Sequence, residues 1–169
     1  MKKTSANGHA LPRLKMAKNF CFGCGKDNPQ GMKLKFRFDH EKQQAICDFT
    51  LSKRYQGPPG HAHGGVIAVI LDEAMGKINK LRQSVALTKT MNIEYMKPTP
   101  LKTKLTVVGF EKSHEGRKHL NAAEIRNAKG EVLARCEGLF IQVDPERMFA
   151  KHLSPGEATG PLAGLRQKR

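Results

Sequence analysis

The residues most suited to chemistry lie in the stretch GHAHGGVIAVILDEAMG, residues 60–76. Two glycines, Gly64 and Gly65, open an apolar helical run that carries Asp72 and Glu73 in its middle. The first amide groups of a helix have no acceptor within the helix, and glycine lets another molecule approach them closely. Such amides form a site for an anion or a polarised carbonyl oxygen. The alternative is that the glycines only permit a sharp turn into the helix.

The two carboxylates of this helix need a reason, because burying an unpaired charge is costly. Adjacent helical residues point about 100° apart, so at most one of Asp72 and Glu73 is expected to face a site. The alternatives are a lysine or N–H partner, or exposure on a polar stripe. Asp72 follows Gly64 by eight residues, about 12 Å along the axis at about 1.5 Å per residue. One reacting carbon does not span that distance, so the spacing predicts a site shared by two copies of the chain, with Glu73 as a structural neighbour.

The elements that position these residues follow from apolar periodicity. Two strand-like segments, residues 32–40 and 43–52, precede the helix and are expected to form a hairpin. Four more follow it, at residues 84–96, 102–114, 117–127 and 132–143. The order ββαββββ with short late turns predicts an α+β fold, in which an antiparallel sheet faces one main helix.

The helix itself, from about Gly65 to Lys80, presents one apolar face at i, i+3, i+4 spacing. That face consists of Ile67, Ile70, Leu71, Ala74 and Ile78. Val66 and Val69 extend the apolar surface around the first turns. Because a sheet covers one side only, the remaining surface suggests a second subunit.

The chain of 169 residues is long enough to bury a core as one domain. We expect a basic N-terminal extension at residues 1–18, a domain at 19–145 and a flexible basic tail at 146–169. No apolar run approaches the roughly 18 residues of a membrane helix. The start is basic but lacks the apolar region of a signal peptide. We therefore expect that the protein has no membrane partner and that it is cytoplasmic.

The net charge of +15 points to a nucleic acid, an acidic partner or a polyanionic small molecule. Basic residues cluster in both tails, where solvated charge is the simpler interpretation. No aromatic RNA-binding motif, basic helical stripe or helix-turn-helix pattern accompanies them, and aromatic residues make up only 6% of the chain. Nucleic acid is the less favoured partner, and a phosphate-rich ligand suits the charge of the body.

Cys21 and Cys24, in CFGCG, have the spacing of half a zinc ribbon. A second such pair is absent, although scattered ligands such as Cys47 or a histidine could in principle converge to complete a site. Gly25 and the following DNPQG indicate a turn. We predict a structural turn with reduced thiols, no bound metal and no cofactor, with the metal and redox interpretations left open.

The segments HGGVIAVILDEAMG, TKTMNIEYMKPTPL and EGRKHLNAAEIRN together resemble the hotdog-fold acyl-CoA thioesterases of the PaaI type. CFGCGKDNPQGMKLKF resembles the start of many members, so the match covers roughly residues 20–143. The resemblance implies an antiparallel sheet wrapped around a long helix, and dimers or dimers of dimers. It implies hydrolysis of an acyl-CoA, or another acyl thioester, to the acid and a free thiol.

The resemblance also implies roles for four residues. The amide of Gly64 would polarise the thioester carbonyl as an oxyanion hole. Asp72 of the neighbouring subunit would be the nucleophile or general base. Thr88 would position the hydrolytic water or the carboxylate, and His63 would orient the loop or hydrogen-bond near the thioester oxygen.

One position departs from the family pattern. Many members place Asn or Gln six residues before this histidine, where the chain has Gly57 with Gln56 beside it. Either Gln56 contacts the thioester instead, with Gly57 and Gly65 lining the substrate, or the polar contact is missing. In the second case the alternative function is a non-catalytic, acyl-CoA-binding hotdog protein.

Overall fold

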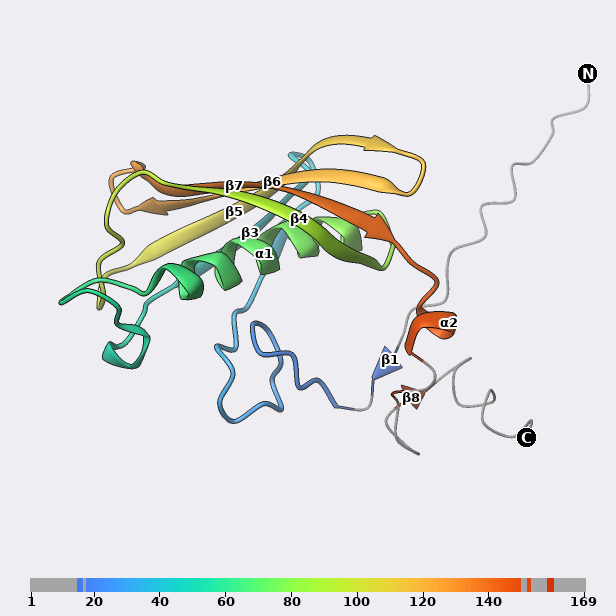
Figure 1. Cartoon of the computed structure of the whole chain (residues 1–169), viewed down its shortest axis with the longest axis horizontal. Coiled ribbons are helices and arrows are strands. Elements are labelled where there is room, and N and C mark those ends of the chain that lie inside the picture. Colours follow the sequence, from blue (N-terminus) through green and yellow to red (C-terminus); the bar gives the residue numbers. More distant parts are fainter. Residues whose placement is uncertain (1–14, 17, 150–151, 153–157, 160–169) are drawn as a thin grey trace, which may run out of the picture.

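One long helix lies against one face of a curved antiparallel sheet in the computed structural model, which describes residues 15–16, 18–149, 152 and 158–159 (Figure 1). The helix is α1 (Gly64–Leu81). The strands of the sheet are β2 (Arg37–Asp39), β3 (Gln44–Phe49), β4 (Ala86–Tyr95), β5 (Leu105–Glu115), β6 (Lys118–Asn127) and β7 (Val132–Gln142). The remaining elements are the 3-10 helix η1 (Lys53–Tyr55), the short helix α2 (Pro145–Phe149) and the paired strands β1 (Lys15–Met16) and β8 (Ala158–Thr159). The predicted α+β fold, a sheet wrapped around one central helix, is confirmed.

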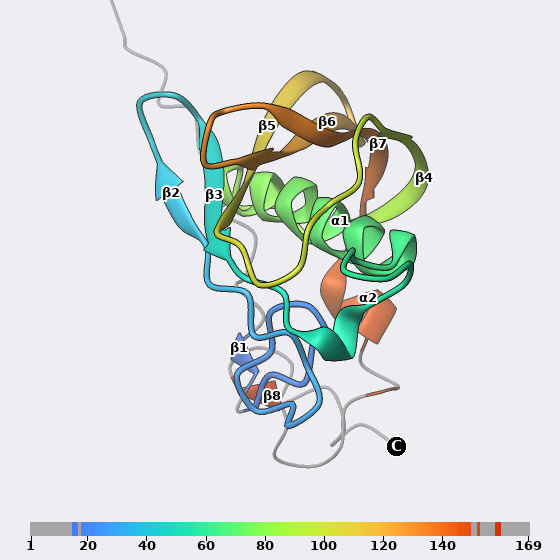
Figure 2. The ribbon, with the colours of Figure 1, turned by 90° about the vertical axis from the view of Figure 1, so that its left-hand side faces the viewer.

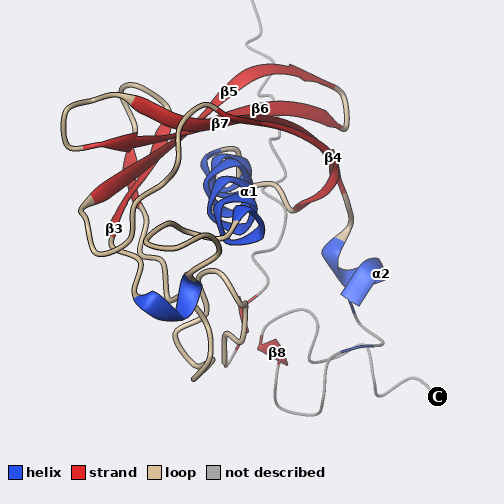
Figure 3. Ribbon diagram, turned by 60° about the vertical axis from the view of Figure 1, so that its left-hand side comes forward, coloured by secondary structure: helices blue, strands red, loops and turns tan. Residues whose placement is uncertain are grey.

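The order of strands in the sheet is β2-β3-β5-β6-β7-β4, and every neighbouring pair is antiparallel. β5, β6 and β7 form a meander through short turns, as their spacing predicts. β4, in contrast, crosses to the far edge and pairs with β7. Viewed nearly along the helix, the sheet curves over α1 (Figure 3), and Figure 2 shows the same wrapping with the helix seen obliquely. Among the residues that the structure describes, one long side of β4 therefore has no paired strand.

The core lies between α1 and the concave face of the sheet. Each residue of the predicted apolar face is buried: Ile67, Ile70, Leu71, Ala74 and Ile78. The helix backbone approaches β5 closely at Gly109, where an added Cβ would lie 2.4 Å from the carbonyl oxygen of Ala74. Glycine is therefore required at this contact, because any side chain would push the helix away from the sheet.

The first predicted strand, residues 32–40, is wrong over most of its length, since β2 covers only Arg37–Asp39. Lys33 has a φ of +56°, outside the extended region. The amides of Met32 and Leu34 donate to the carbonyl oxygens of Phe22 and Gly23 instead of to a strand. The apolar alternation arises here because Leu34 reaches the core from an irregular segment.

We call residues 19–34 the cysteine turn, because it contains Cys21 and Cys24. It forms successive turns, stabilised by Gly25 N–H donating to the Cys21 carbonyl at 2.8 Å. In Figures 1 and 2 this blue segment lies on the side of α1 away from the sheet. Part of the helix surface expected to need a second subunit is thus covered by the chain's own cysteine turn.

The predicted extension and tail fall mostly outside the described residues, so these domain limits stay predictions. Within the described part, the tail begins as α2, and Lys15 pairs with Thr159. Among the described residues, no helix is both long and apolar enough to cross a membrane.

Candidate active site

The start of α1 is capped by a histidine. His63 takes the N-cap position with extended backbone, at φ −67° and ψ 138°. Its Nδ1 accepts a hydrogen bond of 3.0 Å from Gly65 N–H, and its carbonyl oxygen accepts from Val66 N–H at 3.0 Å. Histidine thus performs the capping that Ser, Thr, Asp or Asn usually performs, and Gly65 N–H is occupied within the chain.

Gly64 N–H is the amide at the helix start that remains available. No described residue accepts a hydrogen bond from it. A Cβ added at Gly64 would have only ordinary contacts, at 3.6 Å from the Tyr95 ring, so the position is not sterically restricted to glycine. An unoccupied N–H at the positive end of an 18-residue helix is suited to polarising a carbonyl oxygen.

Tyr95, at the end of β4, holds the same peptide from the other side. Its hydroxyl donates to the Gly64 carbonyl oxygen at 3.1 Å, although the residue is 53% exposed. Sequence reasoning did not single out Tyr95, because its partner lies 31 residues earlier in the chain.

The loop before the helix is anchored by its backbone. His63 N–H donates to the Tyr55 carbonyl, and Ala62 N–H donates to the Thr99 carbonyl at 2.8 Å. Gly57 packs against this anchor, and a Cβ at its position would lie 2.8 Å from the His63 Cα. The asparagine or glutamine expected in relatives therefore does not fit at position 57 with this backbone.

Gln56 is directed toward its own loop. Its side-chain oxygen accepts a hydrogen bond of 3.4 Å from Gly60 N–H, and the residue is exposed. It forms no described contact with Gly64 or Asp72, so the structure does not bring Gln56 to the helix start as a replacement contact.

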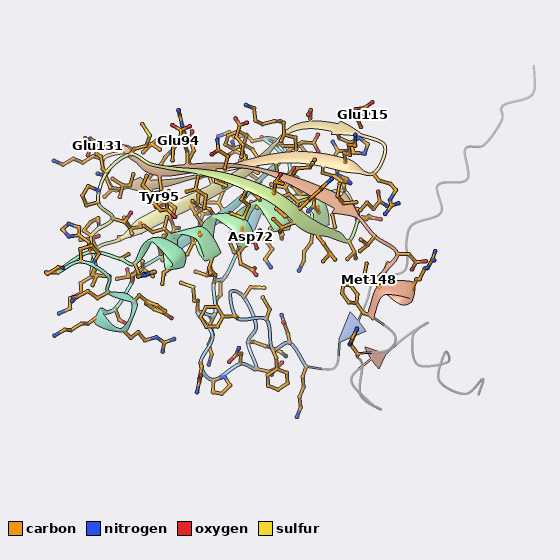
Figure 4. The ribbon with its side chains drawn as sticks, viewed as in Figure 1. Asp72, Glu94, Tyr95, Glu115, Glu131 and Met148 are labelled. Carbon is orange, nitrogen blue, oxygen red and sulfur yellow. The ribbon has the colours of Figure 1, made fainter. Side chains whose placement is uncertain are left out.

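Asp72 lies midway along α1, two turns beyond the helix start (Figure 4). The Thr88 hydroxyl donates to Asp72 Oδ1 at 2.7 Å, joining β4 to the middle of the helix. Burial raises the pKa of the Asp72 carboxyl above its ordinary value, the neighbouring charge of Glu73 raises it further, and the Thr88 hydrogen bond opposes the rise. The result is a half-buried carboxylate that binds a proton more readily than an exposed one.

An irregularity in β4 accompanies this contact. The register with β7 shifts between Thr88 and Thr90, so that Lys89 has no opposite partner. Such a bulge twists a strand locally and redirects its side chains. No residue in TKTMNIEY marks the bulge, so sequence reasoning did not find it.

Glu73 points to a different side of the helix from Asp72, toward the cysteine turn. Glu73 Oε1 accepts from the Cys21 thiol at 2.9 Å, and its Oε2 lies 3.0 Å from Lys77 Nζ. Burial raises the pKa of Glu73, but the Cys21 hydrogen bond and the Lys77 charge outweigh it, and the net shift is downward. The expectation that Glu73 is a structural neighbour agrees with these contacts.

The predicted site residues thus form two groups. Gly64, Gly65, His63, Gly57 and Gln56 gather at the helix start, and Asp72 and Thr88 lie together farther along it. The axial separation of Gly64 and Asp72 is about 12 Å for eight helical residues. In Figure 4 Tyr95 and Asp72 lie at different points along the helix. Within one chain, the two groups do not meet.

Comparison with known proteins identifies the family. Residues 59–134 match the family model of the thioesterase superfamily. The acyl-coenzyme A thioesterase THEM4 of Rattus norvegicus is 31% identical over 111 residues, which cover 65% of this chain and 48% of the relative. The chain therefore spans about half the length of the curated relatives it matches.

Solved structures show the same fold. The thioesterase superfamily protein RHA08564 is 37% identical, with a TM-score of 0.66, over 69% of this chain and 60% of that chain. The PaaI protein from the phenylacetic acid degradation operon of E. coli has a TM-score of 0.60 at 16% identity, over 65% of this chain and 79% of that chain. Smu.793 from Streptococcus mutans UA159, solved bound to acetyl-CoA, has a TM-score of 0.61 at 19% identity, over 65% of this chain and 88% of that chain. Residues 59–134 thus match the thioesterase superfamily, and the chain has the hotdog fold.

Proposed function

We propose that the protein hydrolyses an acyl-CoA, or another acyl thioester, to the free acid and a thiol. The observation that carries this proposal is the pair of groups on α1: an available Gly64 N–H at its positive end and the half-buried Asp72, held by Thr88, in its middle. Similarity to acyl-CoA thioesterases and to a protein solved with acetyl-CoA supports the substrate class.

In the proposed reaction, the thioester carbonyl oxygen accepts a hydrogen bond from Gly64 N–H. The amide stabilises the negative charge that develops on this oxygen when the carbonyl carbon is attacked. Asp72 takes a proton from the attacking water, or attacks the carbon itself and is released by water in a second step. The thiolate leaves and is protonated, so water and thioester give acid and thiol.

The site is proposed to lie between two copies, with Gly64 from one and Asp72 from the other. The separation of the two groups along one helix supports this arrangement, as does the unpaired edge of β4. Two exposed residues lie on that strand. Leu87 precedes Thr88 in the sequence, and Tyr95 contacts Gly64. A second β4 strand pairing with this edge would therefore lie beside both groups.

The direct test is a panel of acyl-CoA substrates with detection of the free thiol, using the native protein and Asp72→Asn in parallel. We expect at least one acyl-CoA to be cleaved by the native protein and far more slowly by the variant. Equal rates for the two proteins across the panel would contradict the proposal.

A second candidate, a non-catalytic protein that binds acyl-CoA, is favoured by one observation. The backbone around Gly57 excludes the amide side chain that the family resemblance leads us to expect there, and Gln56 is turned toward Gly60. For a binding protein, calorimetry would give equal affinities for the native protein and Asp72→Asn, with no thiol released by either.

A further inference from the structure

A second cluster of reactive side chains lies outside the proposed catalytic groups, where the cysteine turn meets α1. One donor atom each from Cys21, Cys24 and Glu73 lies within 4.8 Å of the others. Both cysteines are free and half-buried, so their sulfur atoms are available as ligands. The Lys77 ammonium lies 2.8 Å from the Cys24 sulfur and 3.0 Å from Glu73 Oε2.

We propose that Cys21, Cys24 and Glu73 bind one thiophilic divalent cation of the zinc class. Two cysteine sulfurs and one carboxylate oxygen are a donor set that suits zinc, whose bonds to sulfur and oxygen are about 2.3 and 2.0–2.2 Å. The three donor atoms are already close enough for side-chain rotation to bring them to a common ion. Three protein ligands leave the fourth tetrahedral position for water or a small ligand.

The local backbone presents the donors together. The Gly25 N–H bond to the Cys21 carbonyl closes a tight loop between the two cysteines. Gly23, inside that loop, lies against Glu73 so closely that an added Cβ would be 2.3 Å from the Glu73 Cγ. The absence of a side chain at position 23 lets the carboxylate reach both sulfurs.

The electrostatics of the cluster also suit a cation. Lys77 is only 9% exposed, and its ammonium already contacts two of the three proposed ligands. A positive charge is therefore stable at this position. The Glu73–Lys77 pair is neutral when both thiols are protonated. Exchanging two thiol protons for one divalent cation leaves that net charge unchanged, so binding adds no uncompensated charge to a half-buried site.

Lys77 and the cation compete for the same donors in this arrangement. Its flexible stem allows the ammonium to move off the donor atoms while it stays beside the cluster and balances its charge, and the three ligands then close on the ion. The bound ion would link residues 21–24 to the helix beside Asp72. This inference concerns a site separate from the proposed thioesterase groups, so it does not depend on that function.

The experiment uses the full-length protein, reduced and freed of metal, and titrates it with Zn²⁺ or Co²⁺ alone. We expect one ion per chain, with a sulfur-to-cobalt charge-transfer absorption in the near ultraviolet. Cys21→Ser and Cys24→Ser should each lose the absorption and at least tenfold in affinity, and Glu73→Gln should weaken binding. Cys136→Ser, which removes a buried thiol on β7, is the matched control and should bind as the native protein does.

The Lys77→Met variant distinguishes a metal-binding cluster from one that has only a structural role. Removing the competing ammonium should leave binding intact or tighten it, whereas a packing defect that opened the cluster would weaken it. Circular dichroism melts of every variant identify those that do not fold, and the folded Glu73→Gln and Lys77→Met proteins then decide the question. Cobalt uptake by the native protein no stronger than by the Cys21→Ser, Cys24→Ser double variant would overturn the proposal. So would a Cys21–Cys24 disulfide whose reduced form takes up no metal, an outcome that points to redox chemistry.

Discussion

The Thr88 hydroxyl donates a 2.7 Å hydrogen bond to Asp72, and this contact ties the edge strand β4 to the middle of α1. The Asp72 carboxylate is thereby fixed in direction while its second oxygen stays free of this bond. Burial raises the pKa of the same carboxyl. The Thr88 hydrogen bond orients the Asp72 carboxylate, and burial makes it a slightly stronger base than an ordinary carboxylate.

Asp72→Asn should lower kcat by roughly 10²–10⁴-fold, the range typical of a lost general base, while acyl-CoA binding persists.

The Asp72→Asn substitution should also raise the thermal stability of the protein at neutral pH. The folded state holds the Asp72 proton more tightly than the unfolded state, so its contribution to stability is present at low pH and is lost as pH rises through the raised pKa. Calorimetric melts at neutral and acidic pH check this: the stabilising effect of the substitution should shrink on acidification. Equal destabilisation at both pH values would contradict the assignment.

The acid limb of the pH profile of kcat/KM should report the Asp72 pKa and lie above the ordinary range of an aspartate. Thr88→Val removes the hydrogen bond that opposes the rise, so the limb should move to still higher pH. Thr88→Ser retains a hydroxyl and should return the limb toward that of the native enzyme. A limb that stays in place in Thr88→Val would show that Asp72 is not the titrating group.

Gly64→Pro removes the one amide hydrogen proposed to bind the thioester carbonyl. Proline is well tolerated at the first helical position, and His63 already has the extended backbone required before proline. We expect kcat to fall by roughly 10²–10³-fold, the cost of losing one oxyanion donor, with helix content unchanged by circular dichroism. Gly64→Ala keeps the N–H and meets only 3.6 Å contacts, so it is the matched control and should retain most activity.

Mixing the two inactive variants Asp72→Asn and Gly64→Pro tests whether the site is shared between two copies of the chain. If Gly64 of one copy faces Asp72 of the other, a dimer of one Asp72→Asn chain and one Gly64→Pro chain contains one intact site. Random exchange of chains at equal amounts should restore about one quarter of the native activity. Half of the dimers then contain one chain of each variant, and each of these dimers has one intact site out of two. Thiol release measured after unfolding and refolding the mixture gives the answer. No recovery, in a mixture shown to form dimers, would place both groups within one chain.

Gly57→Ala should destabilise the protein by about 1–3 kcal/mol, the usual cost of overpacking, because the new Cβ would lie 2.8 Å from the His63 Cα. Gly76→Ala is the contrasting substitution. Its new Cβ would meet nothing nearer than 4.0 Å, and alanine in a helix interior is favoured over glycine by roughly 0.5–1 kcal/mol. Urea unfolding curves distinguish the two effects. Equal stability of the two variants would mean that the loop moves to admit a side chain at position 57.

Helical and strand periodicity predicted most of the fold because they are local properties of the chain. The buried face of α1 and the extents of β5, β6 and β7 follow from spacing alone. The position of β4 beside β7 does not, since strand pairing between distant segments depends on the whole sheet. The prediction for residues 32–36 failed for a related reason: their apolar side chains pack on the core from an irregular segment, and not from a strand.

The site shows the same division between local and distant information. Gly64 and Asp72 stand out because their types are unusual for their places in a helix. Histidine as an N-cap is uncommon, so the bond from Gly65 to His63 was not foreseen. The partners of Glu73 and of the Gly64 carbonyl, Cys21 and Tyr95, lie far away in the sequence, and no local pattern identifies them.

The exposed edge of β4 has a consequence for how the protein avoids aggregation. A strand of ten residues with one unpaired edge is a template on which sheets from other molecules can grow. At the opposite end, β2 offers only three residues, too few to propagate a sheet. A symmetric pair joined through β4 would use the long edge of each molecule and leave two short ends facing outward. Such an assembly terminates itself, and the strand that carries Thr88 and Tyr95 would then protect the protein against fibre growth.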